Sequence, residues 1–251
     1  MMFLIFVGLT WGATTRRRRF IFGAAAALGG LQLLIGPFGW FHRYEVDASI
    51  FLVFFCMRVL AERPGFLFGY FALGLLFCAS PYIQGTEDTS AASLEIYRQQ
   101  YQMHRFVTDF YDGDYAINDL GLASFERRPG AYVLDVAGIG SAEAAGQQGK
   151  TADWMEGIVR RHGIHLAILY PEWFDIPRSW TPVARMCEPN EQRVIVSQRC
   201  VVFYSTTPDA AETIRVDLKR FVPTLPPEVL FYFGHPGGGD AMWAPAAVHG
   251  Q

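Results

Sequence analysis

The chain has 251 residues, of which 51% are hydrophobic and 15% aromatic, and its formal net charge is −3. This length allows one ordinary domain beside a membrane region, and the hydrophobic share is high for a wholly soluble protein. Of the 21 basic and 24 acidic residues, seven arginines and three acids lie in residues 1–83, which leaves 14 basic and 21 acidic residues for the rest. That acidic part lacks the basic surface of a nucleic-acid-binding protein, so nucleic acid is not expected as a partner.

The first 83 residues contain four apolar runs that are almost free of charge. Only two of them approach the roughly 20 residues that cross a bilayer. The near absence of charge nevertheless favours membrane-spanning helices over the buried helices of a soluble core. We therefore expect residues 1–83 to form an α-helical membrane bundle of about four transmembrane helices. The four runs are 2–14, 20–36, 48–60 and 66–83.

Arginines set the expected orientation of this bundle. Residues 16–19 are all arginine and come after the first apolar run, and no small-residue cleavage site follows, so the pattern does not indicate a signal peptide. Because positive residues in short loops stay in the cytoplasm, an even number of spans places everything after Ile83 outside. The prediction is a multi-pass protein of the bacterial inner (cytoplasmic) membrane, with membrane lipid as a partner.

An aromatic-rich loop over residues 37–47 is expected on the outer side. Its His42, Arg43 and Tyr44 form a candidate lipid-phosphate site, because the planar guanidinium of Arg43 can bind a phosphate through two hydrogen bonds. The simpler alternative is that Arg43 reaches ordinary lipid headgroups or pairs with Glu45.

Residues 84–233 have the pattern of an extracytoplasmic α/β domain with a mixed sheet. Apolar and aromatic residues at helical spacing predict a helix over 92–110, with Gln99 and Gln100 on the opposite side.

A βαβ unit is predicted next. It consists of a strand over 131–138, a helix over 151–163 that Thr151 caps, and an apolar strand over 164–170. The later elements are strands at 194–196 and 200–204, a helix over 207–221, and a glycine- and proline-rich tail, 234–251, that is expected to be disordered.

Two polar turns lie near the start of this domain. Asn118, Asp119 and Gly121 form the first, and Asp135 and Gly138 end the strand that follows. We expect Asp119 and Asp135 at neighbouring strand ends, where α/β sheets place polar sites. The two carboxylates are a candidate acid–base pair, but stabilisation of the turn by Asp119 and capping of backbone amides by Asp135 is the favoured interpretation.

Cys187 and Cys200 are the two cysteines of the acidic part of the chain. In an oxidising compartment they are a candidate disulfide, and two unpaired buried thiols are the alternative. No phosphate-binding loop, dinucleotide pattern or zinc motif occurs, so no metal site or cofactor is evident. A divalent metal is compatible with the complete protein.

The two polar turns carry a family resemblance. In bacterial polytopic membrane glycosyltransferases of the GT-C class, an "NDxG" turn is followed by "xxDxxGL", and this chain has Asn118, Asp119 and Gly121, then Asp135 and Gly138, with Ile139 in place of the leucine. The stretch 42–45 also looks like the "RYE" junction before the last membrane helices of such proteins. The resemblance runs from about residue 36 to 227.

The resemblance implies the C-terminal part of a GT-C-like glycosyltransferase with a polyprenyl-phosphate-linked sugar as donor, of the mannosyltransferase or arabinosyltransferase kind. The catalytic acids of the family lie in its first external loop, which has no counterpart here, so the resemblance leaves open whether this chain is an enzyme. The contrasting hypothesis is a non-catalytic, membrane-anchored module that binds a glycan or a protein partner.

Overall fold

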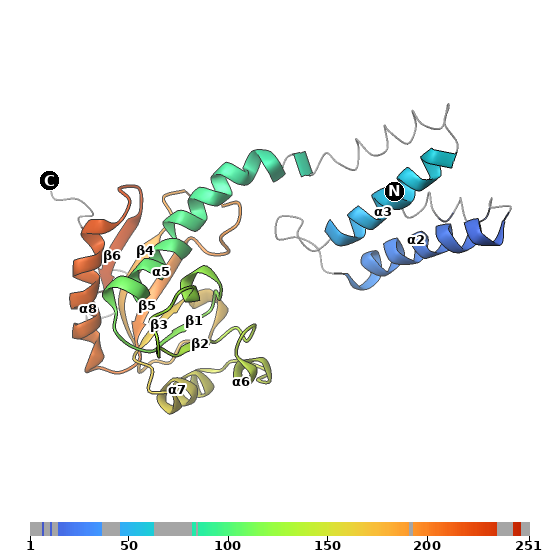
Figure 1. The fold of residues 1–251 in the computed structure, drawn as a ribbon. Helices are drawn as coiled ribbons and strands as arrows, with labels where there is room; N and C mark the ends of the chain where they lie inside the picture. Colours follow the sequence, from blue (N-terminus) through green and yellow to red (C-terminus); the bar gives the residue numbers. More distant parts are fainter. Residues whose placement is uncertain are drawn as a thin grey trace. The chain divides into compact units, whose positions relative to one another are not determined.

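The structure, a computed structural model, describes residues 15–36, 46–62, 82–83, 85–190, 193–234 and 243–246, together with the single positions Val7 and Trp11. The chain divides into two compact units, Met1–Ser90 and Ala91–Gln251 (Figure 1). All described strands belong to the second unit.

Two helices form most of the described part of the first unit. α2 (Arg16–Ile35) begins at Thr15, whose side chain accepts a hydrogen bond from the amide of Arg18 at 3.3 Å, and it contacts α3 (Val46–Glu62). Within the described residues, α2 alone is long and apolar enough to cross a membrane.

The predicted bundle of about four transmembrane helices is therefore wrong for the part of the chain that the structure describes. α3 has 17 residues, fewer than the roughly 20 that a bilayer requires. Low charge was given more weight than length in the prediction, and the runs 2–14 and 66–83 lie almost entirely outside the described residues. One apolar helix near the N-terminus is also typical of an export signal, so it establishes no multi-pass topology.

The second unit begins with a helical segment. Residues 91–98 are helical, α5 (Gln100–Arg105) follows after a turn at Gln99, and a π-helical turn, Phe106–Phe110, ends the segment. The helix predicted over 92–110 is confirmed. Two further helices and a short turn of helix follow along the chain: α6 (Ala142–Ala145), α7 (Ala152–Arg161) and α8 (Ala210–Phe221).

A seven-stranded mixed sheet in the order β2-β1-β3-β5-β4-β6-β7 forms the centre of the described second unit. β1 pairs in parallel with β2 and β3, and the remaining pairs are antiparallel. Because β4 is antiparallel to β5 and β5 to β3, the strands β1 to β4 all end at one edge, which we call the carboxyl edge. The strands are β1 (Tyr115–Ile117), β2 (Val133–Asp135), β3 (Leu166–Leu169), β4 (Thr181–Cys187), β5 (Cys200–Ser205), β6 (Leu230–Gly234) and β7 (Trp243–Pro245).

Alternating side chains build a separate core on each face of the sheet. On one face Ile117, Ile168 and Phe203 pack with Phe106 and with α8. On the other face, Ala167 and the other buried side chains of the strands pack against α7. The α5 segment and α8 thus cover one face, and α7 covers the other (Figure 1).

Several strand predictions need correction. Residues 194–196 form no strand, because their amides bind a side chain instead of a neighbouring strand. β4 was missed because Pro182 and Arg185 interrupt its apolar pattern, and the ladder shifts register after Pro182. β7 lies within the tail that was expected to be disordered, and it pairs with β6.

An arginine joins these last strands. The guanidinium carbon of Arg185 on β4 lies 4.6 Å from the ring centroid of Tyr232 on β6 and 4.9 Å from that of Trp243 on β7. Such cation–π contacts are attractive over an aromatic face. The side chain therefore links three neighbouring strands.

Candidate functional site

The carboxyl edge gathers buried polar side chains from three strand ends. Asn118 follows β1, Tyr170 follows β3 and Glu188 follows β4, and none of the three is more than 2% exposed. Helical residues 95–100 contribute Glu95, Gln99 and Gln100, which are also buried. Buried polar groups require hydrogen-bond partners, so the contacts of these side chains indicate the role of each at the carboxyl edge.

The first polar turn has a shaping role. The Asn118 side-chain oxygen accepts a hydrogen bond from the amide of Tyr170 at 2.8 Å, which fixes the ends of β1 and β3 against each other. Asp119 accepts a hydrogen bond from the Gln100 side-chain amide at 2.9 Å. Gly121 has φ 129°, a backbone conformation that glycine adopts without strain.

The second polar turn is organised by Asp135. Its two carboxylate oxygens accept hydrogen bonds from the amides of Ala137 at 2.9 Å and Gly140 at 2.7 Å, which is the backbone-capping role favoured from the sequence. Gly138 has φ 92°, and a Cβ atom there would lie 2.7 Å from the amide nitrogen of Ala145. Asp119 and Asp135 thus accept from different donors: Asp119 binds the side chain of Gln100, and Asp135 alone caps the amides of the turn that follows it.

Tyr170 is the centre of the buried network. Its hydroxyl donates to the Gln99 side-chain oxygen and lies 3.4 Å from the Gln100 side-chain nitrogen, which donates to it. Burial, followed by the nearby charges of Asp119 and Glu188, raises the pKa of Tyr170 far above its usual value. The hydroxyl therefore stays neutral and serves as a hydrogen-bonding group.

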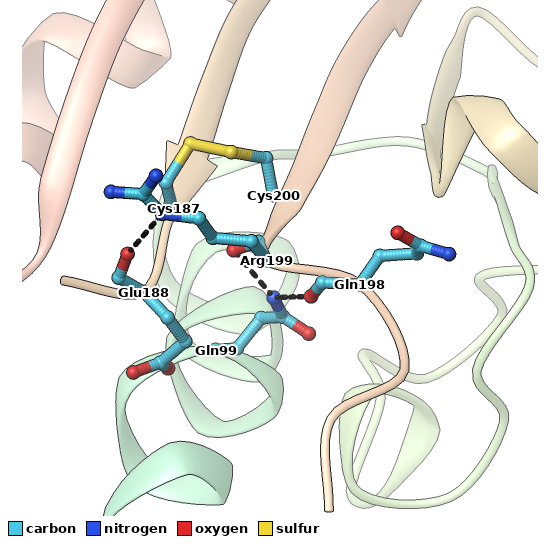
Figure 2. Close-up of a disulfide and its surroundings, with 6 residues drawn as sticks. All are labelled: Gln99, Cys187, Glu188, Gln198, Arg199 and Cys200. Carbon is cyan, nitrogen blue, oxygen red and sulfur yellow. Dashed lines mark hydrogen bonds between the residues drawn. A yellow bond between two sulfur atoms is a disulfide. The ribbon is translucent and has the colours of Figure 1, made fainter. Parts of the chain in front are cut away.

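The predicted cysteine pair, Cys187 and Cys200, forms a disulfide between β4 and β5, with a Cα–Cα distance of 4.0 Å. It closes residues 188–199, which we call the disulfide loop. Figure 2 shows Gln99 below the disulfide, donating to the carbonyl oxygens of Gln198 at 3.1 Å and Arg199 at 3.4 Å. Arg199 in turn donates from Nε to the carbonyl oxygen of Glu188 at 3.1 Å.

Glu95, one helical turn before Gln99, binds the same loop. Its carboxylate accepts hydrogen bonds from the amides of Val194 at 2.7 Å, Ile195 at 2.8 Å and Val196 at 3.1 Å. Hydrogen bonds to an ionised acceptor are about twice as strong as neutral ones. Residues 194–196 therefore take their position from Glu95 and do not join the sheet.

Glu188 is the member of this network whose side chain makes no hydrogen bond, whereas Gln100 and Asn118 each leave one buried side-chain atom without a partner among the described residues. Neither of its carboxylate oxygens has a hydrogen-bond partner among the described residues, and the group points away from the disulfide in Figure 2. Burial raises the pKa of Glu188 to about 7, an effect that Arg98 opposes and Glu95 reinforces. An unpaired buried carboxyl group costs stability, and such groups are frequent at functional sites.

A cleft lies between the helical residues 91–98 and the disulfide loop. Its volume is about 890 Å³, within the range of small-molecule sites. Two arginines, Arg98 and Arg193, combine with apolar residues in its wall. The lining residues are Ala91, Leu94, Glu95, Arg98, Asn190, Arg193 and Val194.

Only part of this site was predictable from the sequence. Gln99 and Gln100 were assigned to the outer side of their helix, and the structure buries both. Tyr170 gave no polar signal inside an apolar run. The candidate lipid-phosphate residues His42, Arg43 and Tyr44 lie outside the described residues. Within the described ranges, no group of three or more His, Cys, Asp or Glu side chains is placed to hold a metal ion.

One family model matches part of the chain. The model, described as a domain of unknown function (DUF8728), matches residues 93–204, which contain β1 to β4, all but the last residue of β5, the disulfide and the network around Tyr170. No curated protein and no solved structure matches the chain. The part of the chain that resembles a known domain is therefore the part that carries the candidate site.

Proposed function

We propose that the chain is the C-terminal part of a GT-C-like membrane glycosyltransferase that uses a lipid-linked sugar donor, with residues 91–234 as its domain outside the cytoplasm. The observation that carries the proposal is the role of the motif residues. Asn118 and Asp119 fix the end of β1 to Tyr170 and Gln100, and Asp135 holds the turn after β2, as expected of residues that define an accessory domain outside the catalytic loop.

The disulfide supports a location of the domain outside the cytoplasm. Disulfides persist outside the cytoplasm and are rare within it, where thiols are kept reduced. Cys187 and Cys200 are paired, and the loop that they close holds the Glu95 and Gln99 contacts. A cysteine introduced at Ile139, which is 83% exposed, should react in intact cells with a membrane-impermeant thiol reagent. Labelling only after permeabilisation would place the domain in the cytoplasm and contradict this part of the proposal.

The function itself is tested by deleting the gene that encodes the chain. If the protein takes part in sugar transfer from a polyprenyl-phosphate carrier, the carrier-linked sugar should accumulate in the deletion strain, and expression of the gene should reverse the accumulation. Mass spectrometry of extracted lipids measures the pool directly. An unchanged pool in both strains would refute a role in this transfer.

A second candidate is a non-catalytic module that binds a glycan, and one surface favours it. Tyr97, Tyr101, His104 and Phe125 form a row of rings with successive centroid distances of 5.5, 6.0 and 6.4 Å, and its members Tyr97 and Phe125 are 47% and 58% exposed. Exposed aromatic rings offer flat apolar faces with polar tips. For this candidate, the full chain should bind isolated cell-envelope glycan, and Tyr97→Ala with Tyr101→Ala should weaken the binding without changing the carrier-linked sugar pool.

A further inference from the structure

We propose that the cleft beside the disulfide loop binds the phosphate group of an organic phosphate ester through Arg98 and Arg193. This inference goes beyond the proposed function and does not depend on it. It rests on how the two arginines are held, on the absence of a hydrogen bond or ion pair from either of them to a described side chain, and on the mixed lining of the cleft.

The Glu95 carboxylate joins the helix that carries Arg98 to the loop that carries Arg193. Arg98 lies three residues after Glu95, so the two side chains share a face of the helix. Arg193 directly precedes Val194, whose amide donates to Glu95 at 2.7 Å. Because Glu95 joins the helix to the loop, it holds the two walls of the cleft together, and each wall contributes one of the two arginines to the lining.

The guanidinium groups are available for a ligand. Among the described residues, neither Arg98 nor Arg193 makes a hydrogen bond or an ion pair with a side chain. Among the described carboxylates, Glu95 accepts three amides, and Glu188, which is 2% exposed, makes no hydrogen bond or ion pair with either arginine. Two arginines facing an open volume are suited to a phosphate, whose oxygens accept paired N–H groups.

The remaining lining indicates an ester and not a bare ion. The volume of about 890 Å³ is far larger than a phosphate needs. Leu94 and Val194, 45% and 39% exposed, provide apolar surface beside the arginines, and Asn190 adds an amide that can bond to a hydroxyl group. A sugar phosphate and a lipid phosphate share this chemistry, so the experiment must distinguish the two sources.

The test uses the full chain in lipid nanodiscs. Equilibrium dialysis with labelled glucose 1-phosphate measures binding of the soluble ester, with glucose as the uncharged control, and flotation with vesicles that contain a polyprenyl phosphate measures binding of the lipid form. Arg98→Gln and Arg193→Gln should each weaken binding by about tenfold, because each removes a charge-assisted contact. Arg160→Gln, an exposed position on α7, is the control for the same change of charge.

The lysine variants add a geometric test. Arg98→Lys keeps the charge but not the planar pair of donors, so it should bind more weakly than the wild type and more strongly than Arg98→Gln. Binding of glucose 1-phosphate would support a soluble ligand, and binding to the vesicles alone would support a lipid one. Loss of binding in Arg160→Gln to the same degree, or no saturable binding of either phosphate probe, would overturn the proposal. A non-reducing gel that shows the disulfide in each variant checks the fold of the loop.

Discussion

Replacing Glu95 with glutamine would test whether its carboxylate joins the helical residues 91–98 to the disulfide loop. Glutamine has one side-chain oxygen and a nitrogen that cannot accept, whereas the carboxylate accepts from the amides of Val194, Ile195 and Val196. A hydrogen bond to a charged group contributes about 1.5–3 kcal/mol and a neutral one about 0.5–1.5 kcal/mol, so the three bonds together should lose about 2–4 kcal/mol. Val194 is 39% exposed and can turn to water, which favours the lower figure.

Amide hydrogen exchange measures this loss at the loop itself. A local loss of about 2 kcal/mol corresponds to roughly 30-fold faster exchange of the amides of residues 194–196. Glu212→Gln on α8 is the matched control, because its side chain is 73% exposed and the change of charge is the same. Unchanged exchange at residues 194–196 in Glu95→Gln, with the disulfide intact, would refute the idea that the carboxylate holds the loop.

Three further predictions concern stability of the second unit, measured by urea unfolding of the full chain. Exchanging Cys187 and Cys200 for serine should lower the free energy of unfolding by about 3 kcal/mol, since the bond joins residues 13 apart, and an unchanged midpoint would contradict this. Because the folded pKa of Glu188, about 7, exceeds its ordinary 4.5, stability should fall by at most about 3 kcal/mol as pH rises from about 4.5 to about 7, and Glu188→Gln should remove this fall. An identical pH profile in the variant would argue against the buried carboxyl. Gly138→Ala should destabilise by about 2 kcal/mol or more, and Gly149→Ala, which meets no atom within 4 Å, by about 1 kcal/mol; equal effects would show that crowding against Ala145 is unimportant.

Elements with a local signal were predictable from the sequence. α7 begins where Thr151 accepts a hydrogen bond from the amide of Trp154, and the apolar face of the helix packs on the sheet. β3 is apolar throughout and buried throughout. The role of Asp135 was predictable for the same reason, since its bonds reach only two and five residues along the chain.

The elements that escaped prediction depend on contacts distant in sequence. Gln99 contacts the hydroxyl of Tyr170 from 71 residues away, so a helical pattern alone placed it on the outer side. Residues 194–196 have the apolar character of a strand, but Glu95, about 100 residues earlier, takes their amides. The membrane prediction failed for a different reason, because it counted uncharged runs without requiring the length of a span.

The short last strand has a consequence for the solubility of the domain. Without β7, the outer side of β6 would present unpaired backbone groups to the surroundings, and such an edge invites strands of other molecules to add to it. Trp243 on β7 lies against Arg185 on β4, which also contacts Tyr232 on β6. The guanidinium group of Arg185 therefore helps to hold β7 beside β6. Three residues of the C-terminal segment thereby protect the sheet against edge-to-edge aggregation, and a chain cut after Gly234 would lose that protection together with the packing of Trp243 and Ala246 against the two hydrophobic cores.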